Sequence, residues 1–118
     1  YAVNGKPQVD GVVLNSSVTV KNRFIGDDIP VTNYALDKIT VPLLAVGHED
    51  DECPGTPATG AEKIAAAATS SPNAKVLILS GGSDIGWHPC RPGTPHTFNG
   101  VEEEVVSVIA RFIKSNLK

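Results

Sequence analysis

The sequence lacks methionine, long apolar runs and any excess of basic residues. Ten lysines and arginines stand against 13 aspartates and glutamates, and the net charge is -3, so neither nucleic acid nor an anionic membrane is an expected partner. Every apolar run stops well short of the roughly 18 residues that a bilayer-spanning helix needs, so we expect no membrane-spanning segment. The absence of methionine leads us to expect a processed or truncated chain.

The amino-acid composition is that of an ordinary globular domain. Of its 118 residues, 41% are hydrophobic and 19% are charged, a balance that favours a folded chain over a disordered one. This length is enough for one modest domain with a hydrophobic core. We therefore predict that residues 1–118 belong to a single domain.

The most informative stretch is TVPLLAVGHEDDECP, residues 40–54. Its apolar run over residues 41–46 is typical of a strand buried on both faces of a parallel sheet. In open α/β sheets, ligands and catalytic groups gather outside the carboxyl ends of the strands. The segment after this run is therefore the leading site candidate. Its chemically active side chains are His48, Glu49, Asp50, Asp51 and Cys53.

Predicted strands and helices alternate along the rest of the chain, which argues for a parallel sheet covered by helices. Residues 1–8 are expected to be irregular, and three strands would leave both sheet edges open. A long loop over residues 80–95 precedes His96, and loops of that length are often functional. The predicted elements are strands over residues 9–14, 41–46 and 75–79, a two-turn helix over 33–39, and helices over 60–69 and 101–116 capped by Thr59 and Asn99.

Two of these segments carry residues that could act together. Asp50 or Asp51 follows one strand and His96 lies in the loop after the next, so both could meet at one edge of a parallel sheet. An imidazole held by a carboxylate is the orienting half of a nucleophilic triad. A solvated acidic loop explains the same aspartates without any catalytic role.

In order and spacing, these segments resemble the carboxyl-terminal half of an α/β-hydrolase. The motifs are VPLLAVGHEDDECPGTP before a helix, then KVLILSGG, a loop and PHTFNGVEEEVVSVIARFI. In that family the acid of the triad follows the penultimate core strand in a G-x-x-D or H-G-x-x-D-type turn, and the histidine precedes the final helix. VDGVVLNSS similarly resembles the strand after the nucleophile-bearing helix. The resemblance covers residues 9–118.

The resemblance implies a role for each matching residue. Asp51 fits the acid best by spacing, with Asp50 as the alternative, and His96 opens an H-x-F motif, with His88 as the alternative. His96 would act as general base and acid, while Asp51 would fix its tautomer. The implied substrate is an ester, lactone, thioester or amide, and no organic cofactor is required.

The nucleophile expected from this resemblance is absent. The family carries its serine in a G-x-S-x-G elbow upstream of the strand predicted at residues 9–14, and the sequence has no such motif. Its nearest approach, G-G-S-D-I-G at residues 81–86, is one residue too long and follows the wrong strand. Loop or strand-end positions explain the other candidates, Ser16, Ser17, Ser80 and Ser83.

We therefore expect the serine to lie outside residues 1–118. The predicted fold is a partial parallel sheet with flanking helices, the C-terminal portion of an α/β-hydrolase fold. Another chain or copy would then cover the exposed edge of the first strand. A non-catalytic hydrolase-like fragment that acts through protein association is the alternative, and the missing elbow favours it.

Cys53 and Cys90 are the only cysteines, and each lies in one of the loops that would carry the Asp and the His. A disulfide between them would close a ring of about 37 residues and stabilise the fold by about 3 to 4 kcal/mol. It would imply a periplasmic or secreted protein. Two free thiols in a cytoplasmic protein are the alternative.

The same loops also suggest a different class of site. Their side chains provide enough nitrogen, sulfur and oxygen donors for zinc. No close C-x-x-C or H-x-x-x-H pair is present, so a zinc-binding domain depends on several loops converging. The donors would come from His48, Asp50, Asp51, Cys53, His88, Cys90 and His96.

Overall fold

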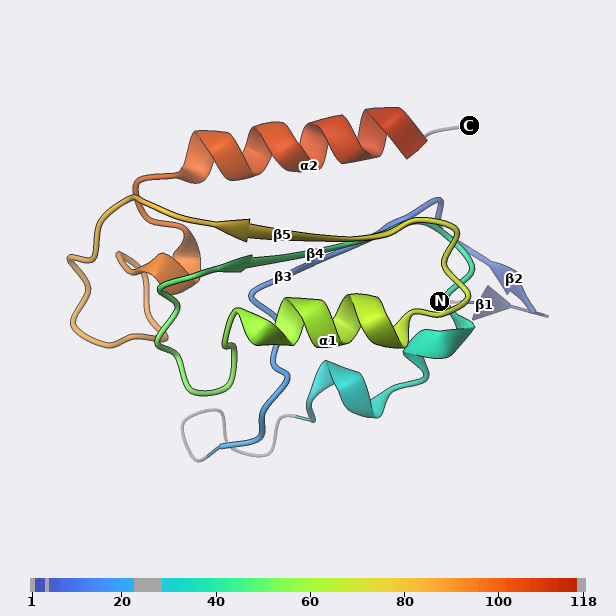
Figure 1. Cartoon of the computed structure of the whole chain (residues 1–118), viewed down its shortest axis with the longest axis horizontal. Coiled ribbons are helices and arrows are strands. Elements are labelled where there is room, and N and C mark those ends of the chain that lie inside the picture. The colour runs from blue at the N-terminus through green and yellow to red at the C-terminus, as the bar shows by residue number, and fades with distance from the viewer. Residues whose placement is uncertain (1, 4, 23–28, 117–118) are drawn as a thin grey trace.

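The strand at the centre of the fold is β4, Leu43–His48, and all six of its residues are buried. The computed structural model describes residues 2–3, 5–22 and 29–116. β4 lies between β3 (Val12–Asn15) and β5 (Ala74–Leu79) in a parallel sheet of order β3-β4-β5. The predicted α/β class, and a central strand buried on both faces, are confirmed (Figure 1).

Helices cover the two faces of this sheet. α1, Thr59–Ala67, lies on one face and α2, Glu102–Asn116, on the other (Figure 1). Successive side chains of a strand point to opposite faces, so β4 contributes to two separate hydrophobic clusters. Leu43 and Ala45 belong to the cluster on the α1 side, and Leu44 and Val46 to the cluster on the α2 side.

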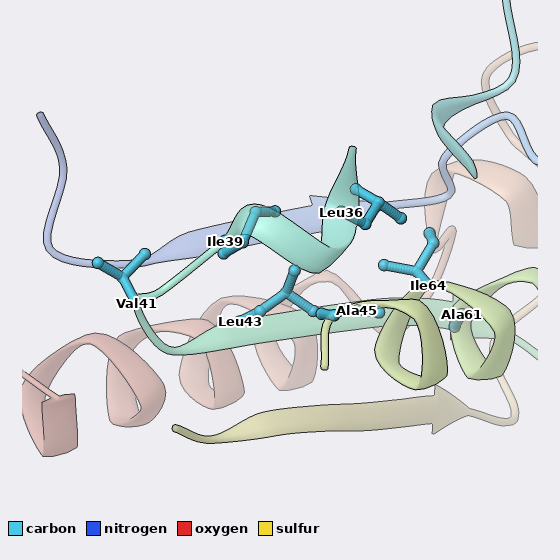
Figure 2. Packing of buried hydrophobic residues seen from close by; sticks show 8 residues of the cluster. Leu36, Ile39, Val41, Leu43, Ala45, Ala61 and Ile64 are labelled. Carbon is cyan, nitrogen blue, oxygen red and sulfur yellow. The ribbon is translucent and has the colours of Figure 1, made fainter. Parts of the chain in front are cut away.

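Figure 2 shows the α1-side cluster, which residues ahead of β4 help to close. Leu36 and Ile39 pack with Leu43, although neither belongs to an α-helix. The two-turn helix predicted over residues 33–39 is wrong, because the chain forms two 3₁₀ turns, η1 (Val31–Asn33) and η2 (Leu36–Lys38). A 3₁₀ turn brings residues three apart onto one side, which is how Leu36 and Ile39 both reach the core.

The strands differ from their predicted bounds by a few residues. β3 begins at Val12 rather than at residue 9, and β4 begins at Leu43 and continues through Gly47 to His48. β5 matches its predicted range to within one residue. Residues 1–8 were expected to be irregular, but Ala2–Val3 (β1) and Lys6–Pro7 (β2) pair antiparallel around Gly5, whose φ of 75° suits the turn.

Both predicted helix caps are wrong. Thr59 is the first residue inside α1, and the N–H groups of Gly60 and Ala61 bond to main-chain oxygens instead. The side chain of Asn99 turns away from α2 and donates to Ser83. Left-handed residues at Phe98 (φ 59°) and Gly100 (φ 86°) flank Asn99, and α2 begins only at Glu102.

The carboxyl ends of all three strands meet at one edge of the sheet. The register pairs Asn15 with Val46 and His48 with Leu79. The loops after β4 and β5 therefore leave from the same edge, at the left of Figure 1, where the 3₁₀ turn η3 (Pro95–Thr97) also lies. Within the described ranges, no helix combines the length and hydropathy needed to cross a bilayer.

Candidate active site

Asp51 lies just beyond the end of β4, in a turn closed by its N–H donating to the carbonyl oxygen of His48 at 3.1 Å. Its side chain has no exposed surface. A buried carboxylate is costly unless donors surround it. Two donors come from its own loop: the N–H of Cys53 to Oδ1 at 2.9 Å, and the hydroxyl of Thr56 to Oδ2 at 2.9 Å.

The third donor is His96, which lies in η3 after the long loop. Its Nδ1 lies 3.0 Å from Oδ2 of Asp51. A carboxylate at this position favours the tautomer with the proton on Nδ1 and leaves a lone pair on Nε2. The imidazole is 19% exposed, and no described residue hydrogen-bonds to its Nε2. That nitrogen is therefore available to a reacting group.

The main chain of His96 is also fixed. The hydroxyl of Ser16, just after β3, donates to its carbonyl oxygen at 2.8 Å. Ser16 has a φ of 41°, an uncommon conformation for a residue other than glycine, at the carboxyl end of its strand. All three strands thus help to place the imidazole, because β3 supplies Ser16, β4 leads to Asp51, and the chain from β5 leads to His96.

A disulfide joins the Asp51 loop to the His96 loop, as predicted. Cys53 and Cys90 are bonded, with their Cα atoms 4.8 Å apart. Cys53 is also the residue whose N–H donates to Asp51. The long loop folds back on itself. The N–H of Ile85 donates to the oxygen of Gly93, and the hydroxyl of Thr94 lies within hydrogen-bond distance of the oxygens of Pro89 and Arg91.

The alternative acid and base lie elsewhere. Asp50 is exposed and lines an acidic depression of about 290 Å³ with Glu52 and Asp84. Nδ1 of His88 accepts a hydrogen bond from the N–H of Cys90 within its own loop. The structure thus pairs Asp51 with His96 and brings neither alternative into that contact.

The buried side chain of His48 makes structural hydrogen bonds with both of its ring nitrogens. It is fully buried, its Nε2 lies 2.8 Å from the oxygen of Gly81, and its Nδ1 accepts from the N–H of Asp50 at 3.0 Å. These two contacts require a neutral ring that donates from Nε2 and accepts at Nδ1. His48 therefore ties the end of β4 to the start of the loop after β5.

The donors suggested for zinc do not converge. The cysteines are bonded to each other, so neither is a thiolate ligand. Within residues 2–3, 5–22 and 29–116, no three His, Cys, Asp or Glu side chains are grouped closely enough to hold a metal ion. The geometry of the described residues offers no support for the zinc alternative.

No serine in the described part of the chain hydrogen-bonds to Nε2 of His96. Ser16 is directed to the main chain of His96, and the hydroxyl of Ser83 accepts from Asn99. Sequence reasoning missed two contributors to the site, Thr56 and the contact made by Ser16. The signal for Thr56 was present in C-P-G-T, a turn motif directly after the aspartates, because its Pro-Gly centre folds the chain back toward them.

Comparison with known proteins gives no relative: no family model, no curated protein and no solved structure matches the chain. The geometry of the site and the sequence motifs are therefore the features that bear on function.

Proposed function

We propose that this chain is the carboxyl-terminal portion of a serine hydrolase of the α/β-hydrolase type. The observation that carries the proposal is the contact between Asp51 and His96, at 3.0 Å between a fully buried carboxylate and a partly exposed imidazole. Its support is that these two residues follow successive parallel strands in the order that the family uses. A surface ion pair would not require the aspartate to be buried among three donors.

In this proposal, the nucleophilic serine comes from outside residues 1–118. Nε2 of His96 accepts the serine proton while the serine oxygen attacks the substrate carbonyl, and the imidazolium then protonates the leaving group. Water repeats these two steps to release the acid and restore the serine. Asp51 holds the tautomer and stabilises the imidazolium. The substrate is an ester, lactone, thioester or amide, and the reaction needs no organic cofactor.

We also propose that the protein works in an oxidising compartment, the periplasm or the exterior of the cell. The support is the Cys53–Cys90 bond, because structural disulfides persist mainly in such environments. A cytoplasmic location would require these cysteines to be free thiols in the native protein.

A fluorophosphonate probe, which labels activated serines, tests where the nucleophile lies. The native protein is treated with the probe, and the labelled peptide is identified by mass spectrometry. We expect one labelled serine outside residues 1–118, and no label after substitution His96→Ala. A label on Ser16 would overturn the external nucleophile, and the absence of any label would overturn the hydrolase.

The outer edge of β3 supports a second candidate function, association through the sheet. The N–H groups of Val12 and Ser16 donate toward β4, to the oxygens of Pro42 and Val46. Because successive N–H groups of a strand point to opposite sides, the N–H groups of Val13 and Asn15 point away from β4. No described strand lies on that side. Such an edge is a template for pairing with another chain.

Apolar depressions flank this edge on both faces of the sheet. On the α1 side, a groove of about 630 Å³ contains Val12, Leu14 and Tyr34. On the α2 side, a smaller depression of about 220 Å³ contains Val13 and Phe112. A strand that paired with β3 and carried apolar side chains on both faces would fill both. This arrangement suits the missing part of the proposed hydrolase and equally a separate partner chain.

A further inference from the structure

We infer that Thr56 is a positioning residue of the proposed triad, holding the Asp51 carboxylate in the orientation that fixes the His96 tautomer. The inference rests on the proposed function for its effect on turnover, but its effect on the imidazole can be measured separately. Thr56 is only 4% exposed. The sequence motifs single out Asp51 and His96 as site residues, but not Thr56.

Three polar atoms meet at this point. Oγ1 of Thr56 lies 2.9 Å from Oδ2 of Asp51 and 2.9 Å from Nδ1 of His96, and those two atoms are 3.0 Å apart. Two hydrogens serve the triangle, one on the hydroxyl and one on Nδ1. The carboxylate is the strongest acceptor present, so the hydroxyl hydrogen goes to Oδ2. The Nδ1 hydrogen then lies between Oδ2 and the lone pairs of Oγ1.

The opposite tautomer does not fit this arrangement. Without a hydrogen, the lone pair of Nδ1 would face the carboxylate oxygen, and the hydroxyl of Thr56 would have to leave Asp51 to satisfy it. Thr56 and Asp51 therefore select the same tautomer together. That tautomer is the one in which Nε2 of His96 is free to take a proton from a nucleophile.

The main chain around Thr56 is built to hold the hydroxyl in place. Its N–H donates to the oxygen of Cys53 at 3.0 Å and closes a tight turn over Pro54 and Gly55. The disulfide anchors one end of this turn. The oxygen of Gly55 accepts the N–H groups of Thr19 and Val20. The hydroxyl is thus fixed on a turn that is tied to two other segments, the loop that contains Cys90 and residues 19–20.

The test compares Thr56→Val, which removes the hydroxyl at nearly constant shape, with Thr56→Ser, which keeps it. The matched control is Thr97→Val, the same change beside His96 at an exposed threonine whose hydroxyl donates only to the oxygen of Thr94. In the native protein, we expect Thr56→Val to lower kcat for an ester about tenfold with little change in KM. Thr56→Ser and Thr97→Val should stay within about twofold of the unmodified protein.

The second measurement does not depend on turnover. Nitrogen-15 NMR of the histidine rings reports the tautomer of His96, with the resonance assigned by its loss in His96→Gln. We expect the Nδ1–H form to dominate in the unmodified protein and in Thr56→Ser, and to lose that dominance in Thr56→Val. Thr56→Ala provides a second hydroxyl deletion if the valine variant does not fold.

The outcomes separate the two proposals. An unchanged His96 tautomer in the folded hydroxyl deletions would overturn the role of Thr56, whether or not the protein is a hydrolase. Equal damage from Thr56→Ser and Thr56→Val would also overturn it, since Thr56→Ser keeps the hydroxyl and the loss of turnover would then not depend on whether the hydroxyl is present. A tautomer change without any ester turnover would support the positioning role and contradict the hydrolase.

Discussion

At the scale of single residues, two glycines allow the loop after β5 to cross closely over the segment that precedes α2. A Cβ on Gly100 would lie 2.8 Å from the Cα of Gly82, and a Cβ on Gly82 would overlap the main-chain oxygen of Asn99. Both glycines have positive φ, 80° at Gly82 and 86° at Gly100. This crossing holds residues 98–100, which begin two residues after His96, against the loop that His48 anchors through Gly81.

The first prediction compares two neighbouring glycines in this loop. Gly81 also has a positive φ, 84°, but its nearest neighbour would be 4.0 Å from an added Cβ. Gly81→Ala should therefore cost only the left-handed conformation, about 1 to 2 kcal/mol of unfolding free energy. Gly82→Ala adds a clash with main-chain atoms and should cost at least about 1 kcal/mol more. Urea unfolding of both variants measures the difference, and equal losses would contradict the close crossing.

At the scale of elements, the sequence predicted the positions of the strands and of the two α-helices to within a few residues, but not how the helices are capped. The apolar run before Gly47 and the acidic cluster after it placed β4 and the site loop correctly, because burial on both faces leaves a nearly continuous apolar pattern. The Thr59 cap failed because Thr59 is itself helical, and main-chain oxygens three residues earlier accept the N–H groups of Gly60 and Ala61. The Asn99 cap failed because its side chain donates to Ser83, 16 residues away, a tertiary contact that the local sequence does not encode.

The edge of β3 gives a prediction at this scale. Asn15 is exposed and its N–H points away from β4, so Asn15→Pro removes a donor only from the outer edge. Leu14→Pro is the contrasting change, because by the same alternation its N–H lies in the ladder with β4. We expect Asn15→Pro to preserve the fold but weaken association of the chain with its partner, and Leu14→Pro to disrupt the fold.

Circular dichroism and native mass spectrometry distinguish these outcomes. Asn15→Pro should retain the circular dichroism spectrum. If the partner is a separate chain, native mass spectrometry should show a smaller fraction of the complex. In a single longer polypeptide, the same change should instead lower the melting temperature. An unaltered complex and an unaltered melting temperature would show that nothing pairs with the outer edge of β3.

At the scale of the whole molecule, the site is assembled from segments far apart in the sequence. The pairing of Asp51 with His96 could be expected because parallel strands end at a common edge. The disulfide could be expected because both cysteines lie in the loops that leave that edge. The turn that brings Thr56 back toward Asp51 was signalled by its Pro-Gly centre, but the contact of Ser16 with His96 was not, because serine is common in any loop and the two residues are 80 positions apart.

The central claim is that His96, oriented by Asp51, is the base of a hydrolase. The measurement that tests it most directly is ester turnover by the native protein, compared between His96→Ala and His88→Ala, with circular dichroism to verify folding. We expect His96→Ala to lower kcat/KM about 10,000-fold and His88→Ala to leave it within about threefold. Turnover that survives in folded His96→Ala, or that disappears in folded His88→Ala instead, would contradict the claim.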